Sequence, residues 1–174
     1  MNSLLIMGYT SFDLGIFDEK DLKVSVIKKA VKNRLIGFLE EGVEWLIFTG
    51  NLGFEYWALE VAKTLQKDYE FKIGTIFAFE TQGQNWNEAN QLKLAAFKEV
   101  DFVKYAYETY ENASQFRQYN DFLLENTAGA FIFYDEENVT KLKYMVEKMR
   151  NTATYELFFL DFEDLQDTFE EMNE

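Results

Sequence analysis

Short apolar runs alternate with stretches of helical period along the whole chain, and this alternation restricts the fold more than any other feature of the sequence. The runs expected to form strands are residues 4–7, 45–49, 72–79, 102–106, 130–134 and 156–160. The stretches expected to form helices are residues 21–41, 54–67, 87–100, 113–126, 142–149 and an acidic segment at 161–174. Such alternation predicts βαβ units, and therefore a single three-layer α/β domain over residues 1–174, with a mostly parallel sheet and helices on both faces.

The local patterns support these assignments. Ile27, Val31 and Leu35 recur at helical spacing. Gly42 follows them as a natural C-terminal stop. Residues 130–134 are apolar without interruption, as expected of a strand that helices cover on both faces. In open parallel sheets ligands bind beyond the carboxyl ends of the strands, so a site is expected in the segments that follow the strands.

Cysteine, histidine and proline are absent from the chain. Without cysteine there is no disulfide framework, no thiolate nucleophile and no thiolate metal site. Without histidine the commonest general base is missing, which excludes a Ser-His-Asp triad and a zinc centre built on histidine or cysteine. We identify no metal-ligating set, and any chemistry must use carboxylates, tyrosine, lysine, arginine, hydroxyls, the backbone or a bound hard cation.

The net charge of −14 is unevenly distributed. Residues 161–174 hold seven acidic residues and no basic one, which is half of the charge excess. This segment is interpreted as a solvated terminal helix or, alternatively, as an acidic face that docks a partner or mimics nucleic acid. Because no basic stripe is available to neutralise phosphates, direct binding to nucleic acid is not expected.

The N-terminal residues indicate the compartment. They carry no basic region and too short an apolar run for a signal peptide. No apolar segment approaches the ~20 residues that cross a bilayer. We therefore expect a cytoplasmic protein without a membrane span.

The turn after the second expected strand is the strongest candidate for a binding site. Gly50 and Gly53 allow a sharp turn and a close approach of the backbone to a ligand. The free N–H groups at the start of the next helix offer an anion site. Asn51 and Glu55 complete the candidate set, with Glu55 either stabilised by the helix dipole or hydrogen-bonding ribose hydroxyls or a water. The G-x-x-G pattern alone also fits an ordinary turn at a strand end, and it lacks the lysine of a Walker motif.

Further candidates follow other strands or begin a helix at the same edge of the expected sheet. These ligand-binding candidates are Gly8, Tyr9, Thr10, Gln84, Trp86, Asn87, Glu88, Gln115, Arg117, Asn120 and Asp135. The amides and the tryptophan at 84–90 suit a surface that reads a base or a ribose, although helix capping alone explains Asn87. Arg117 is one of few cations placed to reach a phosphate, and a surface ion pair is its alternative. Asp135 either accepts from a ligand hydroxyl or caps the following turn.

In order and spacing, these residues make the chain similar to the YpsA family, small proteins of Gram-positive bacteria. The resemblance runs over nearly the whole chain, from Gly8 through the turn at 50–55 to Asp135. Through this family the chain resembles the SLOG superfamily of nucleotide-sensing proteins, which includes DprA and the LOG-type phosphoribohydrolases. The resemblance implies a Rossmann-like fold, a ligand-site role for Gly53 and Glu55, a nucleotide ligand such as NAD or ADP-ribose, and a link to the control of cell division.

The sequence leaves three functions open. The preferred one is a non-catalytic module that binds an NAD- or ADP-ribose-like nucleotide derivative and passes its state to a cytoplasmic protein partner, with a regulatory role in cell division. The second is a phosphoribohydrolase-like or other nucleotide-cleaving hydrolase, with Glu55 and Glu88 as its carboxylates. Leu52 and Phe54 depart from the richer turn of the LOG-type enzymes. The third is an acidic protein-interaction regulator with a vestigial pocket. A homodimer is expected by analogy with other compact sheets.

Overall fold

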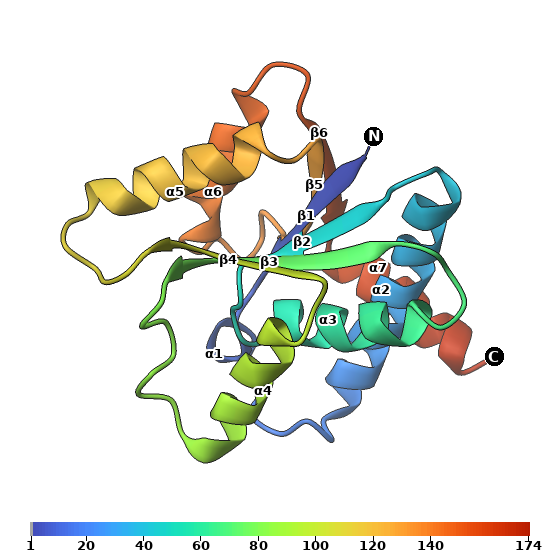
Figure 1. Cartoon of the computed structure of the whole chain (residues 1–174). Coiled ribbons are helices and arrows are strands. Elements are labelled where there is room, and N and C mark those ends of the chain that lie inside the picture. The colour runs from blue at the N-terminus through green and yellow to red at the C-terminus, as the bar shows by residue number, and fades with distance from the viewer. Residues whose placement is uncertain (1) are drawn as a thin grey trace.

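The computed structural model describes residues 2–174, and over that range the chain forms six strands and seven helices (Figure 1). The strands are β1 (Ser3–Gly8), β2 (Trp45–Phe48), β3 (Lys72–Phe79), β4 (Phe102–Tyr107), β5 (Gly129–Phe133) and β6 (Glu156–Leu160). The helices are α1 (Ser11–Leu14), α2 (Leu22–Glu40), α3 (Phe54–Leu65), α4 (Glu88–Lys98), α5 (Ser114–Glu125), α6 (Leu142–Arg150) and α7 (Phe162–Met172). Strand and helix thus alternate as the sequence predicts.

One sheet organises the molecule. Its six strands have the order β4-β3-β2-β1-β5-β6, and every neighbouring pair is parallel. Figure 1 shows α5 and α6 on one face of the sheet and α2, α3, α4 and α7 on the other. The predicted three-layer, Rossmann-like α/β fold with a parallel sheet is therefore confirmed.

The order of the strands places a topological switch point between β1 and β5. From β1 the chain builds outward through β2, β3 and β4, and it then returns to the opposite side of β1 to add β5 and β6. Met7 of β1 pairs with Ile132 of β5, so both strands end at the same level of the sheet. In open parallel sheets ligands bind in the crevice at such a point, beyond the carboxyl ends of the strands.

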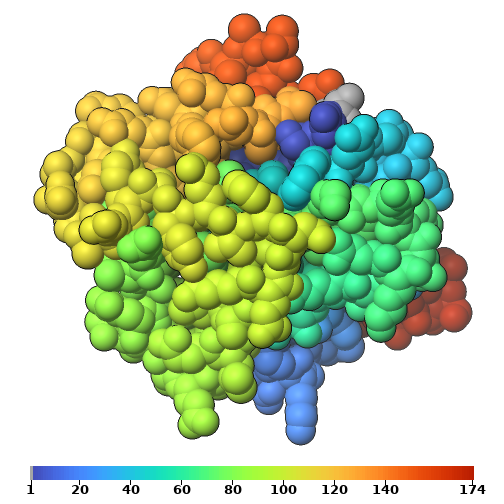
Figure 2. Space-filling model, viewed as in Figure 1, coloured from blue at the N-terminus to red at the C-terminus, as the bar shows by residue number. Residues whose placement is uncertain are grey.

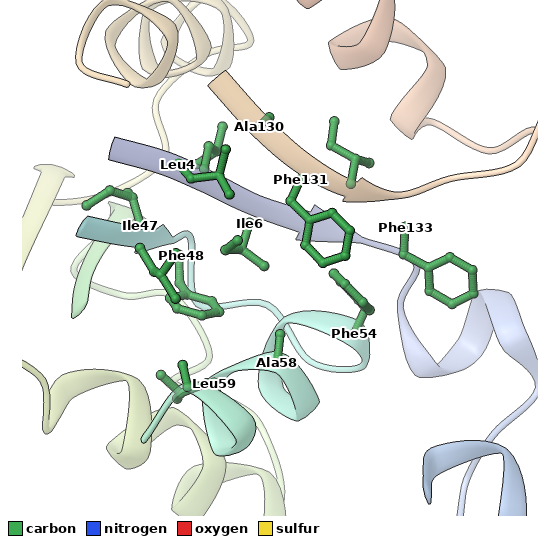
Figure 3. Close-up of a cluster of buried hydrophobic side chains, with 14 of the residues drawn as sticks. Leu4, Ile6, Ile47, Phe48, Phe54, Ala58, Leu59, Ala130, Phe131 and Phe133 are labelled. Atoms are coloured by element: carbon green, nitrogen blue, oxygen red, sulfur yellow. The ribbon is translucent and has the colours of Figure 1, made fainter. Parts of the chain in front are cut away.

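The core packs α3 against the centre of the sheet. Figure 3 shows Phe54, at the start of α3, lying among side chains of β1 and β5. Its ring meets the rings of Phe131 and Phe133 edge-on, with centroids 6.0 and 5.4 Å apart. A Cβ atom at Gly8 would lie 2.4 Å from Phe54 Cδ2, so only glycine fits at the end of β1. The aromatic core thereby fixes the start of α3 directly beneath the end of β1.

The acidic C-terminal segment forms α7, which packs on α2. Asp161 caps α7 in a capping box with Asp164, and Thr168 is buried. Arg34 of α2 lies 3.9 Å from Asp164 and donates to the carbonyl oxygen of Phe159 at 3.0 Å. The end of α7 (dark red) lies at the margin of the molecule in Figure 2. The acids on its outer side remain exposed, as the sequence predicts for a solvated helix.

The sequence did not predict α1. Thr10 and Asp13 form a capping box around this single turn, and Gly15 ends it in the left-handed region at φ 66°. Two of the other expected elements match at both ends, and the rest are present with bounds that differ by one or two residues, mostly because helix ends fall short of their apolar pattern. Within residues 2–174 the structure has no helix long and apolar enough to cross a membrane.

Candidate functional site

The turn after β2 packs with its backbone directly against the turn after β1. Gly50 and Gly53 have φ angles of 88° and 87°, which side chains rarely permit. A Cβ atom at Gly53 would lie 2.5 Å from the backbone nitrogen of Ser11 and 2.7 Å from the carbonyl carbon of Thr10. The N–H group of Phe54 donates to the carbonyl oxygen of Tyr9 at 3.0 Å. The glycines therefore serve the close contact of two turns as well as the sharp change of direction.

Glu55 holds this turn from the inside. Its side chain is only 1% exposed. One carboxylate oxygen accepts from the N–H groups of Thr49 at 2.7 Å and Gly50 at 3.2 Å, and the other accepts from the Thr49 hydroxyl at 2.5 Å. Burial raises the pKa of the Glu55 carboxyl from 4.5 to about 7, although the hydrogen bonds from Thr49 and Gly50 act to lower it. The carboxylate thus consumes two N–H groups that an anionic ligand could otherwise have used.

Side chains from the turn after β3 and from α5 complete this polar cluster. Gln82 donates to the carbonyl oxygens of Thr49 at 3.1 Å and Gly50 at 3.2 Å, and it accepts from the N–H group of Ala78 at 3.3 Å. Tyr119 of α5 donates to the carbonyl oxygen of Ile76. Burial raises the pKa of Tyr119 well above its ordinary value, and the charge of Glu55 adds to the shift.

The exposed part of the turn is Asn51. Its side-chain amide donates to the Thr49 hydroxyl at 3.1 Å, while the residue itself stays open to solvent. Thr10, in the neighbouring turn, is also exposed. The surface that the turn offers to a ligand therefore consists of Asn51, Thr10 and backbone, with the Glu55 carboxylate behind it.

Tyr9 joins the turn after β1 to the turn after β5. It is fully buried, and its hydroxyl accepts from the N–H group of Asp135 at 2.7 Å and lies 2.7 Å from the carbonyl oxygen of Asn138, to which it can donate. Burial raises the pKa of Tyr9 to about 12. The Asp135 carboxylate in turn accepts from the N–H groups of Glu137 at 2.8 Å and Phe162 at 3.0 Å. Tyr9 and Asp135 thus connect the switch point to the start of α7.

The amide-rich segment before α4 is held by caps and by one glutamine. Asn87 caps α4 by accepting from the N–H group of Asn90 at 2.9 Å. Gln91 donates to the carbonyl oxygens of Gly83, Gln84 and Trp86 at 2.7 to 3.3 Å. These contacts fix the loop so that Gln84 faces solvent and Trp86 is half-buried. Glu88, in the first turn of α4, is also exposed.

At the start of α5 the buried Gln115 closes the preceding loop. Its oxygen accepts from the N–H groups of Glu111 at 2.7 Å and Asn112 at 3.3 Å, and its amide donates to the carbonyl oxygen of Thr109 at 3.2 Å. Arg117 is exposed and Asn120 is half-buried on the same helix. Gln115 therefore uses its polar atoms to hold the loop, while Arg117 is the exposed cation of α5.

Comparison with known proteins decides the family. The model of the YspA SLOG family matches residues 4–165. The chain is 79% identical to the UPF0398 protein YfdB of Lactococcus lactis subsp. lactis (strain IL1403), over the full length of both proteins. This chain belongs to the YpsA family of SLOG proteins. It is also 58% identical to a UPF0398 protein of Streptococcus thermophilus (strain ATCC BAA-491 / LMD-9) and 56% identical to one of Streptococcus agalactiae (serotype Ia), each alignment spanning 98% of this chain and 99–100% of the relative.

In this YpsA-family chain the candidate residues fall into three groups. The first surrounds the contact of the two turns and consists of Gly8, Tyr9, Thr10, Gly50, Asn51, Gly53, Glu55 and Asp135. The second consists of Gln84, Trp86, Asn87 and Glu88, whose loop reaches the first group through Gln82. The third consists of Gln115, Arg117 and Asn120 on α5, which approaches β3 through Tyr119. The hydrogen bonds and close backbone contacts described above connect members of the first group.

Sequence reasoning missed four residues that build the site. Thr49 and Gln82 lie in segments that the sequence singled out, and only their hydrogen bonds to the turn distinguish them. Tyr119 and Asn138 come from α5 and from the segment after β5, distant in sequence. Neither residue stands in a recognisable motif, so only the fold could have revealed them.

Proposed function

We propose that this protein is a binding module for a nucleotide derivative of the NAD or ADP-ribose class, held where the turns after β1, β2 and β3 meet. Three observations support the proposal. The turns lie beside the switch point of a parallel sheet, where open α/β folds bind their ligands. The chain belongs to a SLOG family, which favours a nucleotide-related ligand. The turn of Gly50 and Gly53 is built in advance by hydrogen bonds, so binding need not order it.

The observation that carries the proposal is the packing of Gly53 on the backbone of Thr10 and Ser11. This contact brings two turns into one continuous surface with Asn51 and Thr10 exposed upon it. Backbone groups and small polar side chains are the groups that recognise phosphate and ribose in folds of this class. A glutamate that is partly protonated at neutral pH behind this surface also repels an arriving phosphate less than a fully ionised carboxylate does.

Binding without catalysis fits the position of Glu55 better than hydrolysis does. A carboxylate that activates water must reach the substrate, yet Glu55 is 1% exposed and both of its oxygens already accept hydrogen bonds from the turn. One observation favours the hydrolase as the alternative. With a pKa of about 7, Glu55 can exchange a proton at neutral pH, as a general acid or base must. A hydrolase would then need the turn to open during turnover.

We further propose that the bound state is passed to a cytoplasmic protein partner with a role in cell division. Tyr9 and Asp135 link the candidate site to α7 through hydrogen bonds, so a shift of the turn after β1 reaches the acidic helix. This path joins a ligand site to an exposed, strongly charged surface. The acidic regulator with a vestigial pocket remains the competing proposal if no ligand is found, and a homodimer stays a prediction.

A thermal-shift panel tests the proposal. NAD, ADP-ribose, AMP and ADP are added to the wild type, to Gly53→Ala and to Gly42→Ala. A ligand at about 100 times its Kd stabilises the native state by ~2.7 kcal/mol, a rise of roughly 5–10 °C in Tm for a domain of this size. Gly42 has φ 102° and open space around it, so Gly42→Ala controls for backbone strain alone. The proposal expects a shift that Gly42→Ala keeps and Gly53→Ala loses.

The result against the proposal is an unchanged Tm of the wild type with all four compounds. Chromatography of the same mixtures separates binding from hydrolysis. Intact nucleotide after prolonged incubation with stabilised protein supports the binding module. Release of base or ribose phosphate that Glu55→Gln abolishes establishes the hydrolase instead.

A further inference from the structure

A groove lies between α2 and α7, on the face of the sheet that α2, α3, α4 and α7 cover. One hollow of about 400 Å³ lies between Leu22 and Val26 of α2 and the α7 side chains Phe162 and Phe169. A second hollow of about 250 Å³ extends toward Leu14, Ile16 and Phe133. Lys23, Phe162 and Leu165 line both hollows, so the two hollows adjoin, and together they are here called the α2–α7 groove.

Large apolar side chains stand exposed along this groove. Leu22 and Phe169, which line it, are 60% and 38% exposed. Phe12 and Phe17, which flank the lining residues Leu14 and Ile16 in sequence, are 82% and 79% exposed. Exposed apolar side chains such as Leu22 and Phe169 in the lining of an apolar hollow are typical of a surface that a partner covers.

The charges around the groove define the partner's chemistry. Asp13 and Asp21 line the groove. Glu163, Asp167 and Glu170 lie exposed on α7 beside it. Against these five acids stands Lys23 as the cation among the lining residues, and it forms no ion pair within residues 2–174. A basic occupant complements this rim, and an acidic one is repelled.

The shape of the groove fits a helix. Phe162, Leu165 and Phe169 lie on one face of α7 at spacings of three and four residues, a run of about 10 Å at 1.5 Å per residue. An amphipathic helix of about two turns, with apolar residues at i, i+3 or i+4, and i+7, matches that length. An extended strand finds no free sheet edge here, since both walls of the first hollow are helical.

We propose that the α2–α7 groove docks an amphipathic helix of a protein partner, with apolar anchors on one side and lysine or arginine on the other. The groove also adjoins the candidate ligand site. Phe133 and Asn138 line its second hollow, and they contact Tyr9 through an edge-on ring pair at 4.9 Å and the Tyr9 hydroxyl. The first hollow is lined by none of the candidate ligand residues, so docking can be tested separately from nucleotide binding.

Selection from a display library of randomised helical peptides tests this proposal, because the library favours no charge in advance. The wild type is immobilised without nucleotide, and the enriched peptides are synthesised for fluorescence anisotropy. The test variant is Leu22→Ser with Phe169→Ser, two exposed positions whose change spares the core. Leu92→Ser, on α4 and 71% exposed, is the matched control for loss of a surface apolar side chain.

The proposal expects enriched peptides with apolar residues at helical spacing and an excess of lysine or arginine. The double variant should weaken their binding about ten-fold or more, as truncation of interface anchors does, while Leu92→Ser changes it less than about two-fold. Added salt should also weaken binding, since the rim charges are exposed. Circular dichroism of the variants confirms that they keep the fold.

Three results overturn the proposal. The first is a selection that enriches no peptide, or only acidic ones. The second is tight binding that the double variant leaves unchanged, which places the peptide elsewhere. The third is a wild-type dimer in sedimentation that the double variant makes monomeric, which assigns the groove to a second copy of this chain.

Discussion

Replacing Glu55 with glutamine should change how the stability of the protein depends on pH. In the folded protein the Glu55 carboxyl has a pKa of about 7, raised from 4.5 chiefly by burial. Between these two pH values the native state binds more protons than the unfolded chain, so its free energy of unfolding falls as the pH rises. The stabilisation that protonated Glu55 provides is complete below pH 4.5 and is lost as the pH passes through about 7.

The size of this effect follows from the shift. One pKa unit corresponds to about 1.4 kcal/mol, so the full shift of Glu55 is worth about 3 kcal/mol. Because the isoelectric point of the protein lies near 4.5, the pH range that is useful for unfolding measurements begins above this value. Between about pH 5.5 and about pH 8 the wild type should lose about 2 kcal/mol relative to Glu55→Gln.

Urea unfolding followed by tryptophan fluorescence measures this difference at several pH values. Glu60→Gln makes the same substitution on the same helix at a partly exposed position and should keep the decline of the wild type. A constant difference between wild type and Glu55→Gln across the range refutes the reasoning. The reasoning is also refuted if the wild type gains stability relative to Glu55→Gln as the pH rises. That result would mean that the hydrogen bonds of the turn lower the pKa of Glu55 by more than burial raises it.

Three further substitutions test other parts of the account by urea unfolding. Gly53→Ala should be less stable than Gly42→Ala, because both strain the backbone but only Gly53 meets the backbone of Ser11; equal stabilities contradict the close packing of the turns. Tyr9→Phe should cost about 1–3 kcal/mol, since it leaves buried backbone groups unpaired, and an unchanged midpoint argues against the Tyr9 link. The Ile73 N–H group donates to Asp101 and holds the pKa of that carboxyl low, so ionised Asp101 stabilises the fold at pH values above its pKa in the unfolded chain. The loss of unfolding free energy in Asp101→Asn relative to the wild type should therefore shrink as the solution is acidified. A loss that grows on acidification contradicts this role of Asp101.

The fold could be predicted from the sequence because its signals are local. Residues 72–79 and 156–160 match β3 and β6 at both ends, since apolar and β-branched runs are bounded there by polar residues. Only α1 was missed, because a single turn made by a capping box has no apolar period to detect. The alternation of elements then left few topologies for a parallel sheet.

The candidate site was only partly predictable, because its contacts join residues far apart in the chain. The pattern of Gly50 and Gly53 marked the turn, yet nothing in it showed that the backbone of Ser11 lies against Gly53. Tyr9 attracted attention as a residue that could touch a ligand, and the fold places it out of solvent as a link to Asp135. Burial and long-range hydrogen bonds of this kind emerge only when the strands are assembled.

Backbone amide NMR with ADP-ribose is the measurement that tests the central claim most directly. In the wild type, the account predicts that the largest chemical-shift changes on titration fall on Thr10, Asn51 and Gln84 and on the amides beside them. Gly53→Ala should abolish these changes, and Gly42→Ala should preserve them. An unchanged spectrum would contradict the account. So would changes centred on the hollow of Trp45, Phe102 and Lys104, which lies at the amino ends of the strands, away from the candidate site.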